Sequence, residues 1–386
     1  MRPFTPNPHP TVGVEEEFHL IDPKTAELAP CVDDVMAALD EPLRRRVCHE
    51  LFTCVIESNS RPARTVDELV VDVAEMRRRL ASACASAGVL LVAAGTHPFS
   101  DWRKQVFVDS DHYRWVRDGF GTAARHMLAF GLHIHVGLGG ADEALYVMHE
   151  MRRWVYPLMA MGANSPYIAG QDAGLVSART HVFNAMPRTE LPPEFADFAE
   201  LEDLYGKLLG TGDITHPGDL WWCIRPQPVF GTLEIRTLDL PTDVARLGAL
   251  VAVYQAAAAV YQDRFRAGAP RSTFRSEYLN QNRWRAMRDG LRASIIEPQT
   301  GQIVAMVDHV SRLLDLAEGK ADELSSERYL RLARQMLTVG TEADVQRGLV
   351  EQFGGNLREL ELALARRTVP AATFAAEGAV LDSATA

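Results

Sequence analysis

Three consecutive glutamates, Glu15 to Glu17, lie inside the segment TVGVEEEFHLIDP (11–23), which otherwise has the alternating apolar pattern of a buried strand. Successive side chains of a strand point to opposite faces, so Glu15 and Glu17 share one face while Glu16 falls among the apolar residues of the other. Two carboxylates on one strand face repel each other and raise each other's pKa unless a cation lies between them. The pattern therefore predicts a magnesium site on the polar face. Glu16 needs either a local cationic partner or a position at the sheet edge.

A second segment with the same alternation carries two histidines. In FGLHIHVGL (130–138), His133 and His135 project from one face between Gly131 and Gly137, and the apolar residues form the other face. An isolated histidine is more often a satisfied core residue than a ligand. Two histidines on one strand face, with glycines leaving room beside them, indicate a functional site.

A third segment, FGTLEIRTLD (230–239), places a carboxylate and a guanidinium side by side. The expected polar face consists of Thr232, Glu234, Arg236 and Leu238, opposite Leu233, Ile235 and Thr237. In isolation, Glu234 and Arg236 are typical of a plain ion pair. Next to the other two strands, they predict part of a polar cavity.

Two more candidate carboxylates, Glu50 and Glu57, occur in HELFTCVIESNSRP (49–62). Their spacing of seven puts them on opposite faces of a uniform strand, so both reach one site only if the strand begins after Glu50 or contains a bulge. Glu57, in the turn-like ESNSRP, is the stronger candidate. Glu50 is equally compatible with a helix end or an exposed surface.

Hydrophobic periodicity favours an α+β fold. Apolar runs bounded by Gly, Pro or Asp predict strands at 12–20, 51–57, 89–95, 130–138, 220–225 and 232–238. Apolar residues recurring every three or four positions predict helices at 66–87, 142–162, 243–266, 303–318 and 326–337. The two types alternate irregularly and the last 80 or so residues are nearly all helical, which is typical of α+β proteins.

The chain has no internal repeat and no linker, so we expect one domain over residues 1–386, with flexible ends at 1–10 and 369–386. A proline-rich loop at 186–196 is a candidate border of a site. The segment NRWRAMRDG (282–290) predicts a charged helix that either touches nucleotide or faces solvent.

Charge and composition narrow the classes of function. The net charge of −11 argues against binding to nucleic acid or to an anionic membrane. The N-terminal MRPFTPNPHP lacks an apolar signal region and no run of about 18 apolar residues occurs, so we expect a cytoplasmic protein. The five cysteines are odd in number and form no CxxC pair, which predicts reduced thiols rather than a disulfide framework.

Five segments together resemble the glutamate–cysteine ligase type 2 family of carboxylate–amine ligases. They are GVEEEFHLID, ELF…VIESNSRP, GTHPF, GLHIHVG and RPQP…GTLEIRTLD, and they occur in the family's order from Thr11 to about residue 300. The combination is far more specific than any single motif.

The resemblance implies a glutamine-synthetase-like fold, in which an antiparallel sheet curves into a half-barrel with helices outside. The implied activity joins the γ-carboxylate of glutamate to the amine of cysteine, often weakly, with ATP and magnesium as cofactors and manganese as a substitute. The implied metal ligands are Glu15, Glu17, Glu50, Glu57, Glu234 and His133, with His135 as a second candidate. Arg236 is expected to neutralise the transferring phosphoryl group, and Arg225 to reach the same cavity less securely; both are expected to contact the nucleotide.

Elementary chemistry is consistent with that activity. A carboxylate is a poor electrophile, so amide formation in water first requires an acyl phosphate, and phosphoryl transfer depends on positioning and charge neutralisation. Magnesium usually takes only one or two carboxylates per ion, so five glutamates suit two or three ions. The sequence contains neither GxxxxGK[ST] nor GxGxxG, and its short GLGG (137–140) and GTGD (210–213) are typical of turns, which predicts ATP binding without a P-loop.

Two alternatives remain at this point. A metal-dependent hydrolase would also use an HxH pair, but the amidohydrolase barrels carry it on their first strand, whereas here it lies mid-chain behind four of the glutamates. A binding paralogue that keeps the fold without turnover is the other. Amino-acid substrates and ATP are the expected partners, a homodimer is compatible with the sequence, and the amine-binding residues are not identified.

Overall fold

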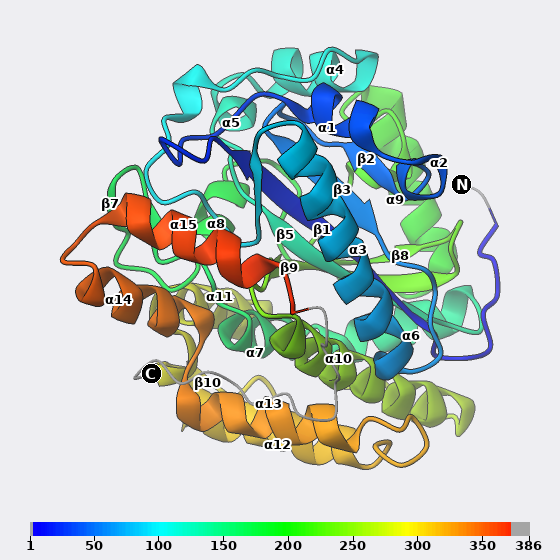
Figure 1. The fold of residues 1–386 in the computed structure, drawn as a ribbon. Coiled ribbons are helices and arrows are strands. Elements are labelled where there is room, and N and C mark those ends of the chain that lie inside the picture. The colour runs from blue at the N-terminus through cyan, green and yellow to red at the C-terminus, as the bar shows by residue number, and fades with distance from the viewer. Residues whose placement is uncertain (1–2, 372–386) are drawn as a thin grey trace.

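A seven-stranded antiparallel sheet, curved into an open half-barrel with helices outside, organises the computed structural model, which describes residues 3–371 (Figure 1). The strands are β1 (Val12–Ile21), β2 (Val47–His49), β3 (Val55–Asn59), β4 (Leu90–Val92), β5 (Gly131–Gly137), β6 (Tyr167–Ile168), β7 (Gln171–Asp172), β8 (Ile224–Gln227), β9 (Thr232–Asp239), β10 (Ser294–Ile296) and β11 (Ile303–Ala305). The main sheet has the order β2-β3-β1-β5-β9-β8, and β4 pairs with the last residues of β1. Two small hairpins, β6-β7 and β10-β11, lie apart from it.

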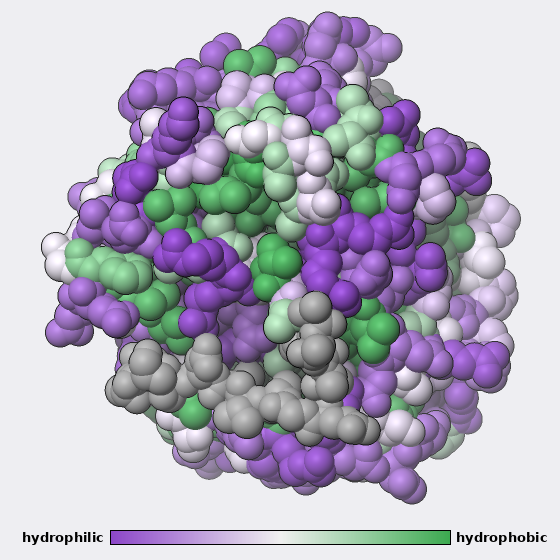
Figure 2. Space-filling view, in the orientation of Figure 1, coloured by the Kyte–Doolittle hydropathy of each residue, from purple (hydrophilic) through white to green (hydrophobic). Residues whose placement is uncertain are grey.

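Helices connect and cover these strands. The α-helices are α1 (Val32–Ala38), α2 (Glu41–Arg44), α3 (Val66–Ser86), α4 (Asp111–Phe120), α5 (Thr122–Arg125), α6 (Ala141–Met151), α7 (Val155–Met161), α8 (Ala178–Phe183), α9 (Phe198–Thr211), α10 (Val244–Arg266), α11 (Ser276–Asp289), α12 (Met306–Glu318), α13 (Glu327–Val339), α14 (Glu342–Gln352) and α15 (Leu357–Thr368). On the face shown in Figure 2, hydrophilic side chains predominate on the helices and hydrophobic ones show mainly between them. This α+β arrangement confirms the predicted fold class.

The main hydrophobic core lies between the sheet and helices α3, α6, α7 and α10. β1 occupies the middle of the sheet, and its apolar residues Val12, Val14, Phe18 and Leu20 all enter this core, as the alternation predicts. The helix α10 packs against α3, α6, α12 and α13 and is almost entirely buried. By length and composition, α10 is the one helix among residues 3–371 that could cross a membrane, but its apolar surface is covered by the protein itself.

Glu16 projects into this apolar core and has a cationic partner. Its Oε1 accepts hydrogen bonds from Arg77 Nε at 2.9 Å and Arg77 Nη2 at 2.6 Å, and both side chains are fully buried. Arg77 comes from α3 and also donates to the carbonyl oxygens of Pro241, Thr242 and Thr368. Burial raises the pKa of Glu16, while the guanidinium opposes that rise. Of the two requirements inferred for Glu16, the structure meets the first, because β1 is not an edge strand.

Several predicted boundaries are wrong. The predicted strand 51–57 is a loop followed by β3, and the predicted strand 220–225 reaches the ladder only at Ile224. The predicted helix 142–162 breaks into α6 and α7, because Pro157 has no N–H to donate to residue 153 and its ring crowds that carbonyl. The helix expected from residue 303 begins at Met306, after β11. Helices 66–87, 243–266 and 326–337 are confirmed within two residues at each end.

The expected face of Leu238 is also wrong. Leu132 pairs with Leu238 but Ile134 pairs with Ile235, so β9 has one residue more than β5 between the two pairs. This β-bulge shifts the alternation, and Leu238 enters the apolar core instead of the polar face.

The N-terminal segment is hydrogen-bonded to the rest of the protein. Within the N-terminal segment, Thr5 N donates to Pro228 O and Asn7 N to Leu138 O. Residues 1–2 and 372–386, which include most of the expected C-terminal tail, lie outside the described residues. All five cysteines are described and are free thiols. NRWRAMRDG is helical as predicted: all of it except Gly290 belongs to α11, which packs against α7 and β10.

We expect Glu16→Gln to lower the free energy of unfolding by about 3 kcal/mol, because it leaves the Arg77 charge buried without its counter-ion. Urea unfolding followed by circular dichroism measures this loss. The folded fraction should keep its turnover, since Glu16 does not face the half-barrel.

Glu57→Gln is the matched control, because the Glu57 carboxylate lies among other carboxylates and does not pair with Arg77. It should leave stability unchanged or raise it while abolishing turnover. Equal destabilisation by both substitutions would contradict the distinct roles assigned to the two faces.

Candidate active site

All seven candidate metal ligands converge on the inner face of the half-barrel. Three overlapping groups have ligand atoms within 4.8 Å of one another: Glu15, Glu57 and His133; Glu15, His135 and Glu234; Glu17, Glu50 and Glu57. We call these seven residues the carboxylate cluster. They come from β1, β3, β5, β9 and the loop after β2, so no short stretch of chain contains the site.

Strand register explains how the cluster assembles. Glu17 lies opposite Glu57 of β3, Glu15 opposite His133 of β5, and His135 opposite Glu234 of β9. Cross-strand neighbours are close enough to interact, and like charges placed opposite each other are destabilising. The pairing of Glu17 with Glu57 therefore lowers the stability of the sheet, but it brings carboxylates together at one site.

Glu15 is the centre of the cluster and contacts both histidines. Its Oε2 lies 2.8 Å from His133 Nδ1, and its Oε1 lies 3.3 Å from His135 Nε2. Burial alone would raise the pKa of Glu15, but the hydrogen bond with His133 and the nearby His135 imidazole hold it well below its ordinary value. Glu15 is therefore ionised throughout the physiological range.

The two histidines are held in fixed orientations. His135 Nδ1 lies 2.9 Å from Thr232 Oγ1, and His133 Nε2 lies 3.4 Å from Glu17 Oε1. The Nε2 atoms of both rings are buried without a hydrogen-bond partner among the described residues. Burial and the Arg236 charge lower the pKa of His133, whereas at His135 Glu15 and Glu234 raise it despite burial.

Glu50 and Glu57 are held at higher pKa values. Burial and then Glu17 raise the pKa of Glu50 to about 7, and burial and then Glu15 raise that of Glu57 well above its ordinary value. Glu50 belongs to neither strand, since β2 ends at His49 and β3 begins at Val55. The loop between them lets both glutamates reach one site, as the spacing of seven required.

Guanidinium groups border the cluster on the β8-β9 side. Glu234 accepts a 2.8 Å hydrogen bond from Arg225 Nε, a 2.6 Å bond from Gln227 Nε2 and a bond from Arg236 Nη1. The charges of Arg225 and Arg236 hold the pKa of Glu234 well below its ordinary value in spite of burial. Arg225 and Arg236 both reach the site, as expected.

Arg179, at the start of α8, is a site residue that the sequence did not reveal. It is buried, its Nη2 donates to Arg236 O at 3.2 Å, and its Nε and Nη1 have no acceptor among the described residues. Gly131 makes room for it, because a Cβ there would lie 2.1 Å from Arg179 Nη2. Nothing in the local pattern around Arg179 signals this position, since only the tertiary fold brings α8 to the strands.

Two cavities open on either side of the cluster. The first is lined by Glu17, Glu50, Arg179, Arg236, Tyr113 and Met186, so the proline-rich loop borders it through Met186. The second is lined by Glu15, Asn59, His135, Thr232 and Phe230, a residue that is 63% exposed. The cluster thus lies between two compartments, one rich in guanidinium groups and one with an exposed aromatic ring.

The cluster has the chemistry of a magnesium site. Oxygen ligands of one magnesium ion lie about 3 to 4 Å apart at Mg–O distances of about 2.1 Å, comparable to the spacing of these ligand atoms. Carboxylate oxygens are the ligands that magnesium prefers, and the partnerless His133 Nε2 and His135 Nε2 provide further donors.

The chain is similar to known proteins over nearly its whole length. A family model described as "Glutamate-cysteine ligase family 2 (GCS2)" matches residues 11–360. A protein of Chloroflexus aggregans named "Putative glutamate--cysteine ligase 2" is 32% identical over 373 residues, covering 96% of this chain and 95% of its own. A protein of Thermobifida fusca with the same name is 33% identical, covering 94% and 92%.

Two solved structures share the fold. A glutamate–cysteine ligase from Francisella tularensis in complex with AMP superimposes with a TM-score of 0.71 at 11% identity, covering 96% of this chain and 91% of that one. A bifunctional glutathione synthetase from Pasteurella multocida gives 0.66 at 11% identity, covering 93% and 52%. At this identity the likeness concerns the fold alone.

We expect Mg²⁺ to raise the thermal midpoint of unfolding more at pH 8 than at pH 6. The folded-state pKa of Glu50 is about 7, above its ordinary 4.5, so its contribution to stability is complete below pH 4.5 and is lost as pH rises through 7. Above pH 7 we expect the ionised carboxylate to bind Mg²⁺ and the bound ion to restore stability. Differential scanning fluorimetry with Mg²⁺ and with EDTA measures the effect.

Glu342 and Glu361, which are also buried with a pKa of about 7, add a pH dependence that does not involve Mg²⁺. The difference between the Mg²⁺ and EDTA samples removes their contribution. Glu50→Gln should reduce the pH dependence of that difference, and a midpoint insensitive to Mg²⁺ at both pH values would contradict the site.

Proposed function

The chain belongs to glutamate-cysteine ligase family 2, and from this premise we propose that it is an ATP-dependent ligase that joins the glutamate γ-carboxylate to the amine of cysteine. The observation that carries the proposal is the position of the carboxylate cluster between the two cavities. Phosphoryl transfer from a nucleotide to a carboxylate needs two bound substrates that meet at a site able to hold magnesium.

We assign the second cavity to ATP. Phe230 offers an exposed aromatic face for stacking with adenine, its ring centroid 6.0 Å from that of His135. The triphosphate then extends toward Glu15 and Glu234 without a glycine-rich phosphate loop. The fold neighbour bound to AMP supports nucleotide binding by this fold.

We assign the first cavity to the acyl donor. Arg179 and Arg236 line it, and three of their buried nitrogens, Nε and Nη1 of Arg179 and Nε of Arg236, have no acceptor among the described residues. A buried guanidinium without an acceptor is costly, and a carboxylate matches its geometry with two parallel hydrogen bonds. An anionic amino acid satisfies these donors.

The reaction then proceeds in two steps. An oxygen of the γ-carboxylate attacks the terminal phosphorus of ATP, and the bond to the leaving ADP oxygen breaks, giving an acyl phosphate. The amine then attacks the acyl carbon, loses a proton and displaces phosphate. Arg236 neutralises charge on the transferring group, while Arg225 and Gln227 hold Glu234 in place. Magnesium, which carboxylates of the cluster such as Glu15, Glu17 and Glu234 would hold, would offset the negative charge of the phosphates.

We further propose that residues 1–386 form a single ligase domain, that the protein acts in the cytoplasm on small molecules, and that neither nucleic acid nor membrane is a partner. The hydrolase alternative is disfavoured, because His133 and His135 lie on a strand of an open antiparallel sheet rather than in a barrel. A non-catalytic paralogue remains an outcome of the tests.

Hydroxylamine should trap the acyl phosphate. With wild-type protein, ATP, Mg²⁺ and glutamate, we expect a hydroxamate and a matching amount of ADP. Colorimetric detection of the hydroxamate with Fe³⁺ measures it. ADP release that needs no carboxylate, with no hydroxamate from any tested amino acid, would contradict the ligase mechanism.

Arg236→Ala should lower kcat by at least about a hundredfold with little change in ATP affinity. Its charge matters most where negative charge is reorganised in the transition state. Steady-state phosphate release and equilibrium binding of a fluorescent ATP analogue separate the two effects.

Arg179→Ala is the matched comparison, because Arg179 lines the same cavity but does not contact Glu234. It should raise KM for the carboxylate substrate more than it lowers kcat. A large loss of ATP affinity in either variant would show that the nucleotide occupies the first cavity and would reverse the assignment.

A further inference from the structure

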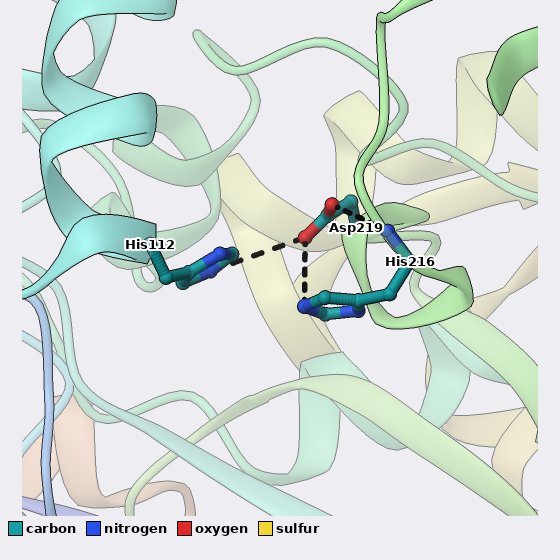
Figure 3. A group of neighbouring side chains, drawn as sticks. All are labelled: His112, His216 and Asp219. Atoms are coloured by element: carbon teal, nitrogen blue, oxygen red, sulfur yellow. Dashed lines mark hydrogen bonds and ion pairs between the residues drawn. The ribbon is translucent and has the colours of Figure 1, made fainter. Parts of the chain in front are cut away.

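His112, His216 and Asp219 meet at the rim of the first cavity, apart from the carboxylate cluster (Figure 3). His112 is the second residue of α4 and lines the cavity, whereas His216 and Asp219 belong to the turn that leads to β8. His216 Nε2 lies 3.4 Å and His112 Nε2 3.9 Å from Asp219 Oδ1. Their ligand atoms all lie within 4.8 Å of one another.

Asp219 is fully buried and only half satisfied. Its Oδ2 accepts hydrogen bonds from Thr215 N at 2.6 Å, Thr215 Oγ1 at 2.7 Å and His216 N at 3.1 Å. Its Oδ1 has no hydrogen-bond partner among the described residues and is the atom that faces both imidazoles. Buried carboxylate oxygens are rarely left in this state, because the lost hydration is not replaced.

The local sequence HPGD holds the turn and places His216. A Cβ at Gly218 would lie 2.7 Å from His216 Cε1 and 2.8 Å from its Nδ1, so the glycine lets the ring lie close over the backbone. The rings of His112 and His216 are nearly parallel, with an interplanar angle of 29° and centroids 5.2 Å apart. Both rings therefore approach the same oxygen from neighbouring directions.

We propose that His112 Nε2, His216 Nε2 and Asp219 Oδ1 bind a divalent transition-metal ion of the zinc class, with water as the fourth ligand. Tetrahedral ligands at about 2.0 Å from zinc lie roughly 3.3 Å apart, so the observed spacing needs only a small contraction. Imidazole suits zinc, cobalt and nickel, whereas magnesium prefers oxygen ligands. The three hydrogen bonds to Asp219 Oδ2 hold the carboxylate in place, as groups around a metal site commonly do for the ligands of the metal.

The bound ion has a structural role. It ties α4, which lines the first cavity, to the turn before β8, which is far from α4 in sequence and leads directly to Trp221 of the same cavity. The same turn accepts hydrogen bonds from Arg225 Nη1, through Gly218 O at 2.5 Å and Leu220 O at 2.7 Å. The ion therefore orders the turn whose carbonyl oxygens hold Arg225 of β8 against Glu234. This inference does not depend on the reaction proposed above.

Zinc binding by the intact chain tests the site. Protein stripped with a chelator is dialysed against Zn²⁺ in excess Mg²⁺, which competes with zinc for the carboxylate cluster, and bound zinc is measured by mass spectrometry. Wild type should hold one zinc more per chain than His112→Ala or His216→Ala, and each substitution should weaken zinc binding more than about a hundredfold, beyond the loss typical of outer-shell changes. Co²⁺ in place of Zn²⁺ should give the visible absorption of a tetrahedral site in wild type only.

Two further variants sharpen the result. His181→Ala removes an exposed histidine of α8 outside the group and should bind zinc like wild type. Gly218→Ala keeps all three ligands but displaces the His216 ring, and should weaken binding by about tenfold. Equal zinc content in wild type, His112→Ala and His216→Ala would overturn the proposal, whether or not the protein proves to be a ligase.

Discussion

The buried ion pair between Glu16 and Arg77 fixes which face of β1 looks into the half-barrel. A one-residue slip of a strand moves every side chain to the opposite face. A charged residue on the apolar side opposes such a slip only if its ion-pair partner is also on that side. Arg77 is that partner, held by α3 and by three backbone carbonyls. With Glu16 in place, Glu15 and Glu17 must face the inner side.

The inner face then carries more carboxylates than its histidine and arginine side chains can neutralise. Glu15 and Glu234 are kept ionised by histidines and guanidinium groups, while Glu50 and Glu57 are driven toward the protonated form. Such a divided set of pKa values is typical of functional sites. Under the proposed function, divalent cations that bind together with a nucleotide would stabilise such a site.

Much of this arrangement could be predicted from the sequence, because strand alternation is a local property. The inward direction of Glu15, His133 and Glu234 follows from period two, and β1, β5 and β9 lie close to their predicted bounds. The bulge in β9 could not be predicted, because the alternation of apolar and polar residues along this strand does not indicate an extra residue. Arg179, Phe230 and the group of His112, His216 and Asp219 depend on tertiary packing between distant segments, which periodicity does not report.

Anomalous X-ray scattering from crystals grown with Mn²⁺ and a non-hydrolysable ATP analogue tests the central claim most directly. We expect manganese ions bound to carboxylates of Glu15, Glu17, Glu57 or Glu234 and to phosphate oxygens, with the adenine beside Phe230. A nucleotide bound with no manganese at the carboxylate cluster would contradict it.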